Sequence, residues 1–312
     1  MSTFHAPNVV LPEASPEDLR IGRLLGRGVV DPRATRAVLV GFPSDEGVRR
    51  NGGRPGAAQA PDAIRQMLYR MTPDARTHDA FVEVVERTVD LGNLSPAGTM
   101  EEHQARLGEV VGPYLPQGVV PIVLGGGHET TYGHFLGYVH DACPVAILNW
   151  DAHADVRPLK DGQGHSGSPF RQALEHPTGL CTGYMVAGLL PHSTARAHLD
   201  FLQGHMGRYF WHEDVTPGLI NVLYAQDADA MLVSFDLDAV DQQAAPGVSA
   251  PAVAGLNPAL WFKAAYEAGR CPRVSSVDIV EYNPALDVDG RTARLAALTV
   301  WHFLRGLAER QA

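Results

Sequence analysis

The sequence contains few cysteines: its 312 residues include only Cys143, Cys181 and Cys271. These three residues are far apart and form no C-x-x-C pair, so we expect neither a disulfide framework nor a thiolate zinc site. Scarce cysteine suits a reducing compartment, and we expect a cytoplasmic protein. No apolar run approaches the roughly 18 to 20 residues that cross a bilayer, so no membrane partner is expected.

Positive charge is also scarce. Lysine occurs only as Lys160 and Lys263, and 25 Lys+Arg face 35 Asp+Glu, which gives a formal net charge of −10 at pH 7. A sequence pI near 5.7 lacks the basic surface of a nucleic-acid binder, so no nucleic-acid partner is expected. Hydrophobic residues make up 45% of the chain, which is enough to bury a core and excludes a mainly disordered protein.

Short apolar runs alternate with segments of helical spacing. The predicted strands are residues 37–42, 119–124, 145–149, 184–189, 231–235 and 274–279. The predicted helices are residues 61–71, 101–114, 193–203, 258–268 and 293–308. Strands that are apolar on both faces and alternate with helices indicate an α/β fold, a three-layer αβα arrangement with a mainly parallel sheet. We expect one domain over 1–312, with 1–35 as an N-terminal extension.

Three of the predicted strands end in polar clusters. Residues 125–129 read GGGHE, residues 150–155 read WDAHAD, and residues 236–238 read DLD. Side chains two positions apart in an extended segment point to the same side. Because the carboxyl ends of parallel strands lie at one edge of a sheet, we expect these groups to converge. The candidate residues are His128, Asp151, His153, Asp155, Asp236 and Asp238.

Four carboxylates brought close together repel one another unless cations lie among them. Two divalent ions balance four carboxylate charges. Oxygen and imidazole ligands without thiolate suit Mn²⁺, Mg²⁺, Fe²⁺ or Zn²⁺, and the excess of carboxylate favours a hard ion such as Mn²⁺. A pair of such ions lowers the pKa of a water molecule between them, so the expected reaction is a hydrolysis.

The order of the G-G-H, D-A-H-x-D and S-F-D-x-D motifs resembles that of the ureohydrolases, the family of arginase, agmatinase and formimidoylglutamase. This resemblance covers nearly the whole chain. It implies an arginase-like, eight-stranded, mainly parallel sheet with helices on both faces, two Mn²⁺ ions per subunit, and a homo-oligomer. It also implies metal-ligand roles for all six candidates, with Asp151 and Asp236 as bridging carboxylates.

Two segments resemble the formimidoylglutamase branch of that family. Residues 246–251 read PGVSAP, where arginase and agmatinase have a PGTGTP pattern, and residues 166–170 read SGSPF. Arg157 stands two residues beyond Asp155, where arginases place a side chain that contacts the substrate carboxylate. The implied substrate is the small anionic amidine N-formimidoyl-L-glutamate, which is hydrolysed to L-glutamate and formamide in histidine degradation.

The two carboxylates of that substrate favour arginines around the site. Arg49, Arg50 and Arg54, which lie in a segment that also resembles formimidoylglutamase, are candidates beside Arg157. For each of these three loop arginines, a plain surface role is an equal alternative.

Two further residues match catalytic positions of the family. Glu281 matches the glutamate that pairs with the guanidinium or amidinium group, and its alternative is a buried carboxylate at a strand end. His165 stands where agmatinase-like members place a proton-shuttling histidine, and its alternative is a loop histidine. Two other functions stay open: an agmatinase or other guanidino-compound hydrolase, and a catalytically silent metal-binding relative.

Overall fold

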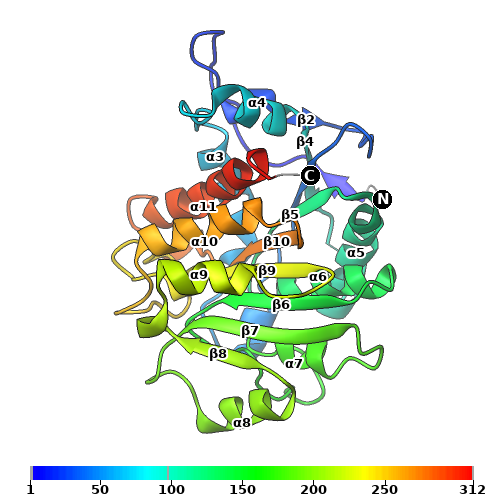
Figure 1. Ribbon diagram of the computed structural model, residues 1–312, viewed down its shortest axis with the longest axis vertical. Helices are drawn as coiled ribbons and strands as arrows, with labels where there is room; N and C mark the ends of the chain where they lie inside the picture. Colours follow the sequence, from blue (N-terminus) through cyan, green and yellow to red (C-terminus); the bar gives the residue numbers. More distant parts are fainter. Residues whose placement is uncertain (1–2, 97, 311–312) are drawn as a thin grey trace.

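The computed structural model describes residues 3–96 and 98–310, which fold around a ten-stranded sheet (Figure 1). The strands are β1 (Phe4–His5), β2 (Gly26–Arg27), β3 (Ala37–Gly41), β4 (Thr88–Leu94), β5 (Val120–Leu124), β6 (Val145–Trp150), β7 (Cys181–Leu189), β8 (Arg208–Trp211), β9 (Met231–Asp236) and β10 (Val274–Val280). Their order is β1-β4-β3-β5-β10-β9-β6-β7-β8, with β2 beside β4. The β1–β4 pair is antiparallel and the other pairs are parallel.

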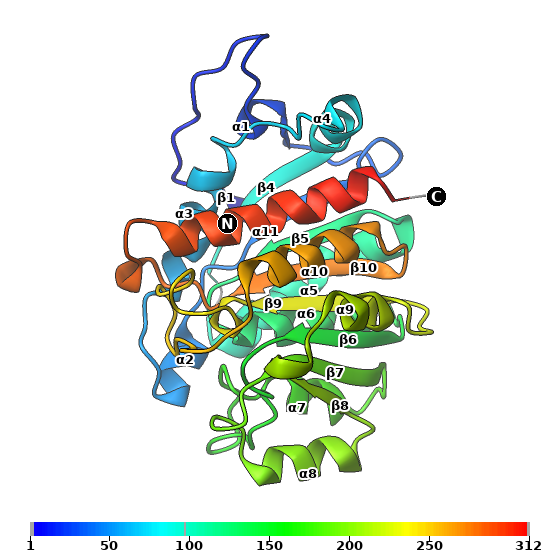
Figure 2. The ribbon, with the colours of Figure 1, turned by 60° about the vertical axis from the view of Figure 1, so that its left-hand side comes forward.

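Helices cover both faces of this sheet, which gives the three layers (Figures 1 and 2). One layer contains α3, α4, α9, α10 and α11, and the other contains α5, α6 and α7. The helices are α1 (Ile21–Leu24), α2 (Glu46–Asn51), α3 (Ala60–Leu68), α4 (His78–Glu86), α5 (Met100–Val111), α6 (Glu129–His140), α7 (Pro169–Leu174), α8 (Arg196–Gly204), α9 (Pro217–Tyr224), α10 (Pro258–Arg270) and α11 (Arg291–Ala308).

The core lies on both sides of the sheet because successive side chains of a strand face opposite layers. In β6, Leu148 and Trp150 pack into the cluster under α10 and α11, whereas Val145 and Ile147 pack into the cluster under α6. All of them are buried. The parallel strands are therefore apolar on both faces, as the sequence predicted.

The structure confirms the three-layer α/β class, the six predicted strands and the five predicted helices. The eight strands β3 to β10 form the parallel sheet that the resemblance implies, and the two-residue strands β1 and β2 extend it. Four strands were not predicted: the two-residue strands β1 and β2, and the strands β4 and β8. Strand β4 contains Asp90, which is buried because Arg65 of α3 forms an ion pair with it at 2.9 Å, and β8 is a four-residue edge strand.

Helix α6 was also missed, because glycines interrupt its sequence. Gly133 and Gly137 lie where α6 packs closely on α5: a Cβ at Gly133 would lie 3.0 Å from Cα of Gln104, and one at Gly137 would lie 2.5 Å from a methyl of Val111. The glycines therefore permit close helix packing at the cost of helix propensity. Among the described residues, no helix has the length and apolar character needed to cross a membrane.

Candidate active site

Four neighbouring strands in the middle of the sheet, β5, β10, β9 and β6, carry the polar clusters at their carboxyl ends. His128 follows β5, Glu281 follows β10, and Asp238 follows β9. Asp151, His153 and Asp155 follow β6. The sheet order thus brings together segments that are far apart in the sequence, as expected for a parallel sheet.

The first group of candidate metal ligands surrounds the ring of His128. Its Nδ1 atom lies 2.8 Å from Asp236 Oδ2, 3.1 Å from Asp155 Oδ2 and 3.4 Å from Asp151 Oδ2. Asp155 has a φ of 44°, a left-handed conformation that is uncommon for residues other than glycine and that typically marks functional sites. One imidazole and three carboxylates therefore face a common point.

The second group consists of His153, Asp238 and Asp151. His153 Nδ1 lies 3.1 Å from Asp238 Oδ2 and 3.5 Å from Asp151 Oδ1. Asp151 thus offers one oxygen to each group, so the two groups share a carboxylate. The six residues that the sequence singled out as metal ligands are all brought together here.

The chemistry of these donors fits two cations. His128 is fully buried, yet its Nδ1 has no hydrogen-bond partner among the described residues, and the same holds for Oδ1 of Asp238. Burial and the charges of Asp238 and Asp151 raise the pKa of Asp236 well above its ordinary value. A pair of cations would satisfy the unpaired atoms and neutralise the carboxylates.

A chain of buried hydrogen bonds orients the ring of His128 from behind. Its Nε2 lies 3.0 Å from Ser234 Oγ, which donates to Asp278 Oδ1 at 2.5 Å. The other carboxylate oxygen of Asp278 lies 2.8 Å from Nδ1 of His134. With Nε2 engaged by Ser234, Nδ1 is the nitrogen left to bind a metal, the arrangement usual for histidine ligands.

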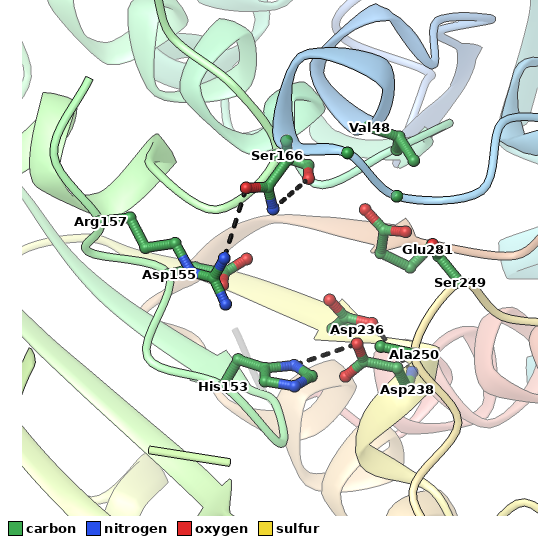
Figure 3. A pocket seen from close by; sticks show the side chains of 13 residues that line it. Val48, His153, Asp155, Arg157, Ser166, Asp236, Asp238, Ser249, Ala250 and Glu281 are labelled. Atoms are coloured by element: carbon green, nitrogen blue, oxygen red, sulfur yellow. Dashed lines mark hydrogen bonds and ion pairs between the residues drawn. The ribbon is translucent and has the colours of Figure 1, made fainter. Parts of the chain in front are cut away.

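Glu281 points into the same cavity from the end of β10 (Figure 3). Its Oε1 accepts the backbone hydrogen of His128 at 2.7 Å, and its φ of 65° lies in the left-handed region. Burial, together with the charges of Glu129 and Asp238, raises the pKa of Glu281 to about 8. This carboxyl group faces the cavity beside the two ligand groups without belonging to either of them.

The cavity has a volume of about 200 Å³ and opens between the metal-ligand clusters and α2. Figure 3 shows Arg157 on the side of His153 and Asp155, opposite Glu281. The lining residues are Val48, Asn51, Gly52, Gly53, His153, Asp155, Arg157, Ser166, Asp236, Asp238, Ser249, Ala250 and Glu281. The volume suits a small molecule, with Arg157 at one end and Glu281 at the other.

The other three candidate arginines do not line this cavity. Arg49 is exposed and pairs with Asp45 at 2.9 Å. Arg50 pairs with Glu46 at 3.2 Å and with Glu101. The guanidinium of Arg54 donates to the carbonyl oxygens of Val248 and Ser249, and so fixes the 246–251 segment beside the cavity. Their guanidinium groups are thus engaged elsewhere, although their role in substrate binding stays a prediction.

His165 lies outside the cavity lining as well. It is buried, and both ring nitrogens meet backbone groups of its own loop: Nε2 lies 3.0 Å from the oxygen of Pro158, and Nδ1 accepts from the N–H of Gly167 at 3.1 Å. Its role as a proton donor stays a prediction. Its observed contacts stabilise the conformation of its own loop.

Sequence reasoning missed several residues of the site. Ser234 lies two positions before Asp236 on β9, so alternation along the strand could have identified it. Asp278 lies on β10, three positions before Glu281. Asn51 and Ser166 also line the cavity. Both lie in segments that resemble formimidoylglutamase, but the resemblance assigns neither of them a role.

Fold and site together define a three-layer α/β protein with a candidate dinuclear metal centre at the carboxyl edge of a parallel sheet. The model of the Arginase family matches residues 35–305, and the chain belongs to this family.

Similar proteins include two curated relatives and a solved structure. The chain is 37% identical over 292 residues to "Formimidoylglutamase" of Geobacillus thermodenitrificans, a match that covers 89% of this chain and 88% of the relative. It is 38% identical over 275 residues to "Formimidoylglutamase" of Rhodococcus jostii, covering 83% and 82%. The crystal structure of Trypanosoma cruzi formiminoglutamase with two Mn²⁺ is 30% identical, with a TM-score of 0.84 over 94% of this chain and 99% of that chain.

Proposed function

We propose that this chain is a formimidoylglutamase that hydrolyses N-formimidoyl-L-glutamate to L-glutamate and formamide with two Mn²⁺ ions. The observation that carries the proposal is the cavity itself: two metal-ligand groups share Asp151, and Glu281 and Arg157 line the space beside them. The curated relatives named above, and a structural relative solved with Mn²⁺, support the same activity and metal.

The metal ligands in this proposal are the residues of the two groups. Asp151 would be a ligand in both groups. Asp236, which the resemblance also makes a bridging ligand, lies beside His128 of the first group. Two Mn²⁺ ions bound here would lower the pKa of a shared water molecule, so that hydroxide is available near neutral pH. The complete set is His128, Asp151, His153, Asp155, Asp236 and Asp238.

Glu281 orients the amidine end of the substrate. One of its oxygens is held by the backbone of His128. The positive charge of a bound amidinium group would favour the ionised form that burial disfavours, so the carboxylate could accept N–H hydrogen bonds from that group without losing its own position. A charge-assisted hydrogen bond of this kind is roughly twice as strong as a neutral one. Glu281 therefore places the formimidoyl carbon beside the two ligand groups.

Arg157 binds the acidic end of the substrate. Within the described part of the chain it forms no ion pair with a carboxylate, whereas Arg49 and Arg50 do. Its planar guanidinium can make two parallel hydrogen bonds to one carboxylate. A cationic substrate such as agmatine gains nothing from this arginine, which favours the dianionic amidine.

In the proposed reaction, water adds to the formimidoyl carbon and the bond from that carbon to the α-nitrogen of glutamate breaks. The nitrogen takes up a proton and leaves as the amino group of L-glutamate, and the carbon leaves as formamide. The proposal also includes a single domain over 1–312, a cytoplasmic homo-oligomer and a place in histidine degradation.

The experiment is a product assay with the Mn²⁺-loaded protein. N-formimidoyl-L-glutamate, agmatine, arginine and 4-guanidinobutyrate are supplied in parallel, and glutamate, formamide and urea are measured. We expect glutamate and formamide from the first compound alone. Urea from a guanidino compound, with no formamide, would assign the chain to another branch of the family. Bound Mn²⁺ without any turnover would indicate a silent relative.

A further inference from the structure

The loop between β6 and α7 presents Arg157 and Ser166 to the cavity, and its internal hydrogen bonds determine where these side chains lie. The N–H of Arg157 donates to the oxygen of Gly167 at 2.9 Å, so the two ends of the loop are joined. His165 lies inside the loop. One ring nitrogen contacts Pro158, near the start of the loop, and the other contacts Gly167, near its end.

The ring of His165 has a defined protonation in this arrangement. Nε2 must carry a hydrogen to donate to the carbonyl oxygen of Pro158, and Nδ1 must be bare to accept from Gly167. Both nitrogens are therefore used within the loop. Burial lowers the pKa of His165, which agrees with a neutral ring.

Helix α2 holds the same loop from the opposite side. The N–H of Ser166 donates to the oxygen of Gly47 at 3.1 Å. The amide of Asn51 connects the two cavity-lining side chains: its Nδ2 donates to Ser166 Oγ at 3.2 Å, and its Oδ1 accepts from Arg157 Nη1 at 3.4 Å.

Gly167 shows how closely these parts pack. A Cβ at this position would lie 3.0 Å from Cδ of Arg157 and 3.0 Å from Nδ2 of Asn51. The arginine stem and the Asn51 amide thus fill the space where a side chain would be. The amide of Asn51 therefore restrains the long, exposed side chain of Arg157, which would otherwise have many rotamers.

We propose that Asn51 and His165 are positioning residues that hold Arg157 at the mouth of the cavity, ready to bind a carboxylate of the substrate; this rests on the proposed function, which supplies that carboxylate. Asn51 restrains the guanidinium directly, and His165 keeps the loop closed. Neither residue takes part in proton transfer. The proposal differs from the role of proton donor that the resemblance implies for His165.

The experiment compares KM and kcat for N-formimidoyl-L-glutamate in Asn51→Ala, Arg157→Gln and the double variant. We expect Asn51→Ala to raise KM about tenfold with kcat changed less than about twofold, because one hydrogen bond that prepares the binding group is lost. The double variant should have the KM of Arg157→Gln alone, because Asn51 acts through Arg157. Asp161→Asn is the control: it removes a charge from the exposed part of the same loop, outside the cavity lining, and should leave KM unchanged.

His165 is tested by two substitutions that cannot titrate. His165→Gln keeps an amide hydrogen for Pro158, whereas His165→Ala keeps neither hydrogen bond. We expect KM to rise more in His165→Ala than in His165→Gln, with the pH profile of kcat retained in both. An equal, large fall in kcat in both variants, with one limb of the pH profile lost, would overturn the positioning role and establish a proton donor.

The outcomes separate this proposal from the proposed function. Wild-type turnover of N-formimidoyl-L-glutamate with an unchanged KM in Asn51→Ala would overturn the positioning role alone. A wild-type protein that hydrolyses a cationic guanidino compound instead would overturn both. If His165→Ala does not fold, His165→Gln still tests the role of His165. The cycle of Asn51→Ala and Arg157→Gln tests the role of Asn51 independently.

Discussion

Ser234 Oγ lies 3.0 Å from Nε2 of His128. Both residues are buried, and the hydroxyl of Ser234 in turn donates a hydrogen bond to Asp278. The ring that faces three carboxylates on one side is thus held on its other side by a hydroxyl group. The orientation of a candidate metal ligand depends on a residue that touches no metal.

The first prediction concerns that hydroxyl. Ser234→Ala should weaken Mn²⁺ binding at the first ligand group by roughly 10- to 100-fold, because a buried imidazole N–H loses its partner and the ring loses its restraint. Titration followed by electron paramagnetic resonance measures this affinity. Ser275→Ala is the matched control. It also removes a serine hydroxyl, but that hydroxyl contacts Tyr138 at 2.6 Å and no candidate metal ligand. Equal affinity in both variants would mean that packing against Phe170 alone orients the ring.

The second prediction concerns charge repulsion among the carboxylates. Asp238→Asn removes one charge from the cluster and leaves the side-chain volume unchanged. Without metal, this variant should melt at the same temperature as the wild type or higher, because repulsion falls. With Mn²⁺ the order should reverse, since binding at 100 times Kd stabilises the wild type by about 2.7 kcal/mol. Thermal melting in chelator and in excess Mn²⁺ measures both; a variant less stable in chelator would show that repulsion is small.

The third prediction concerns Glu281. Glu281→Gln keeps an oxygen to accept from the N–H of His128 but loses the charge that would face the amidinium group. We expect kcat/KM for N-formimidoyl-L-glutamate to fall by roughly 10²- to 10³-fold, the usual cost of one such electrostatic contact. Bound Mn²⁺, measured by elemental analysis, should stay at the wild-type ratio. Activity close to that of the wild type would make Glu281 a structural carboxylate at the end of β10.

The fourth prediction concerns His103 of α5, which is buried against Phe42 with ring centroids 4.2 Å apart. Burial lowers its pKa to about 4 from the ordinary 6.5. Between these values the unfolded chain binds the proton and the folded protein does not, so stability is complete above pH 6.5 and falls toward pH 4.

The test compares the wild type with His103→Gln, which cannot take up a proton. The wild type should lose about 3 kcal/mol more than the variant between pH 7 and pH 4, because each pKa unit corresponds to about 1.4 kcal/mol and the folded protein itself begins to bind the proton near pH 4. Urea denaturation at the two pH values measures this difference. Equal losses in both proteins would show that the pKa of His103 is the same in the folded and unfolded states.

The sequence by itself determined the class of fold and the chemistry of the site. Apolar runs such as 231–235 predict strands buried on both faces, because only a sheet covered by two helical layers can bury them. The spacing of Asp151, His153 and Asp155 places three metal-binding groups at one strand end. These are local properties, set by side-chain polarity and by the alternation of an extended chain.

Only the tertiary structure decided which neighbours each group has. Strands β5, β10, β9 and β6 are adjacent although residues 125–144, 151–230 and 237–273 separate their sequences. This order joins His128, Ser234 and Asp278. Asn51 reaches Arg157 across 106 positions. Arg49, Arg50 and Arg54 lie within six residues of one another but have different partners, because ion pairs and carbonyl contacts are formed between elements that the local pattern does not relate. Contacts of this kind depend on the packing of the layers, and local periodicity carries no information about them.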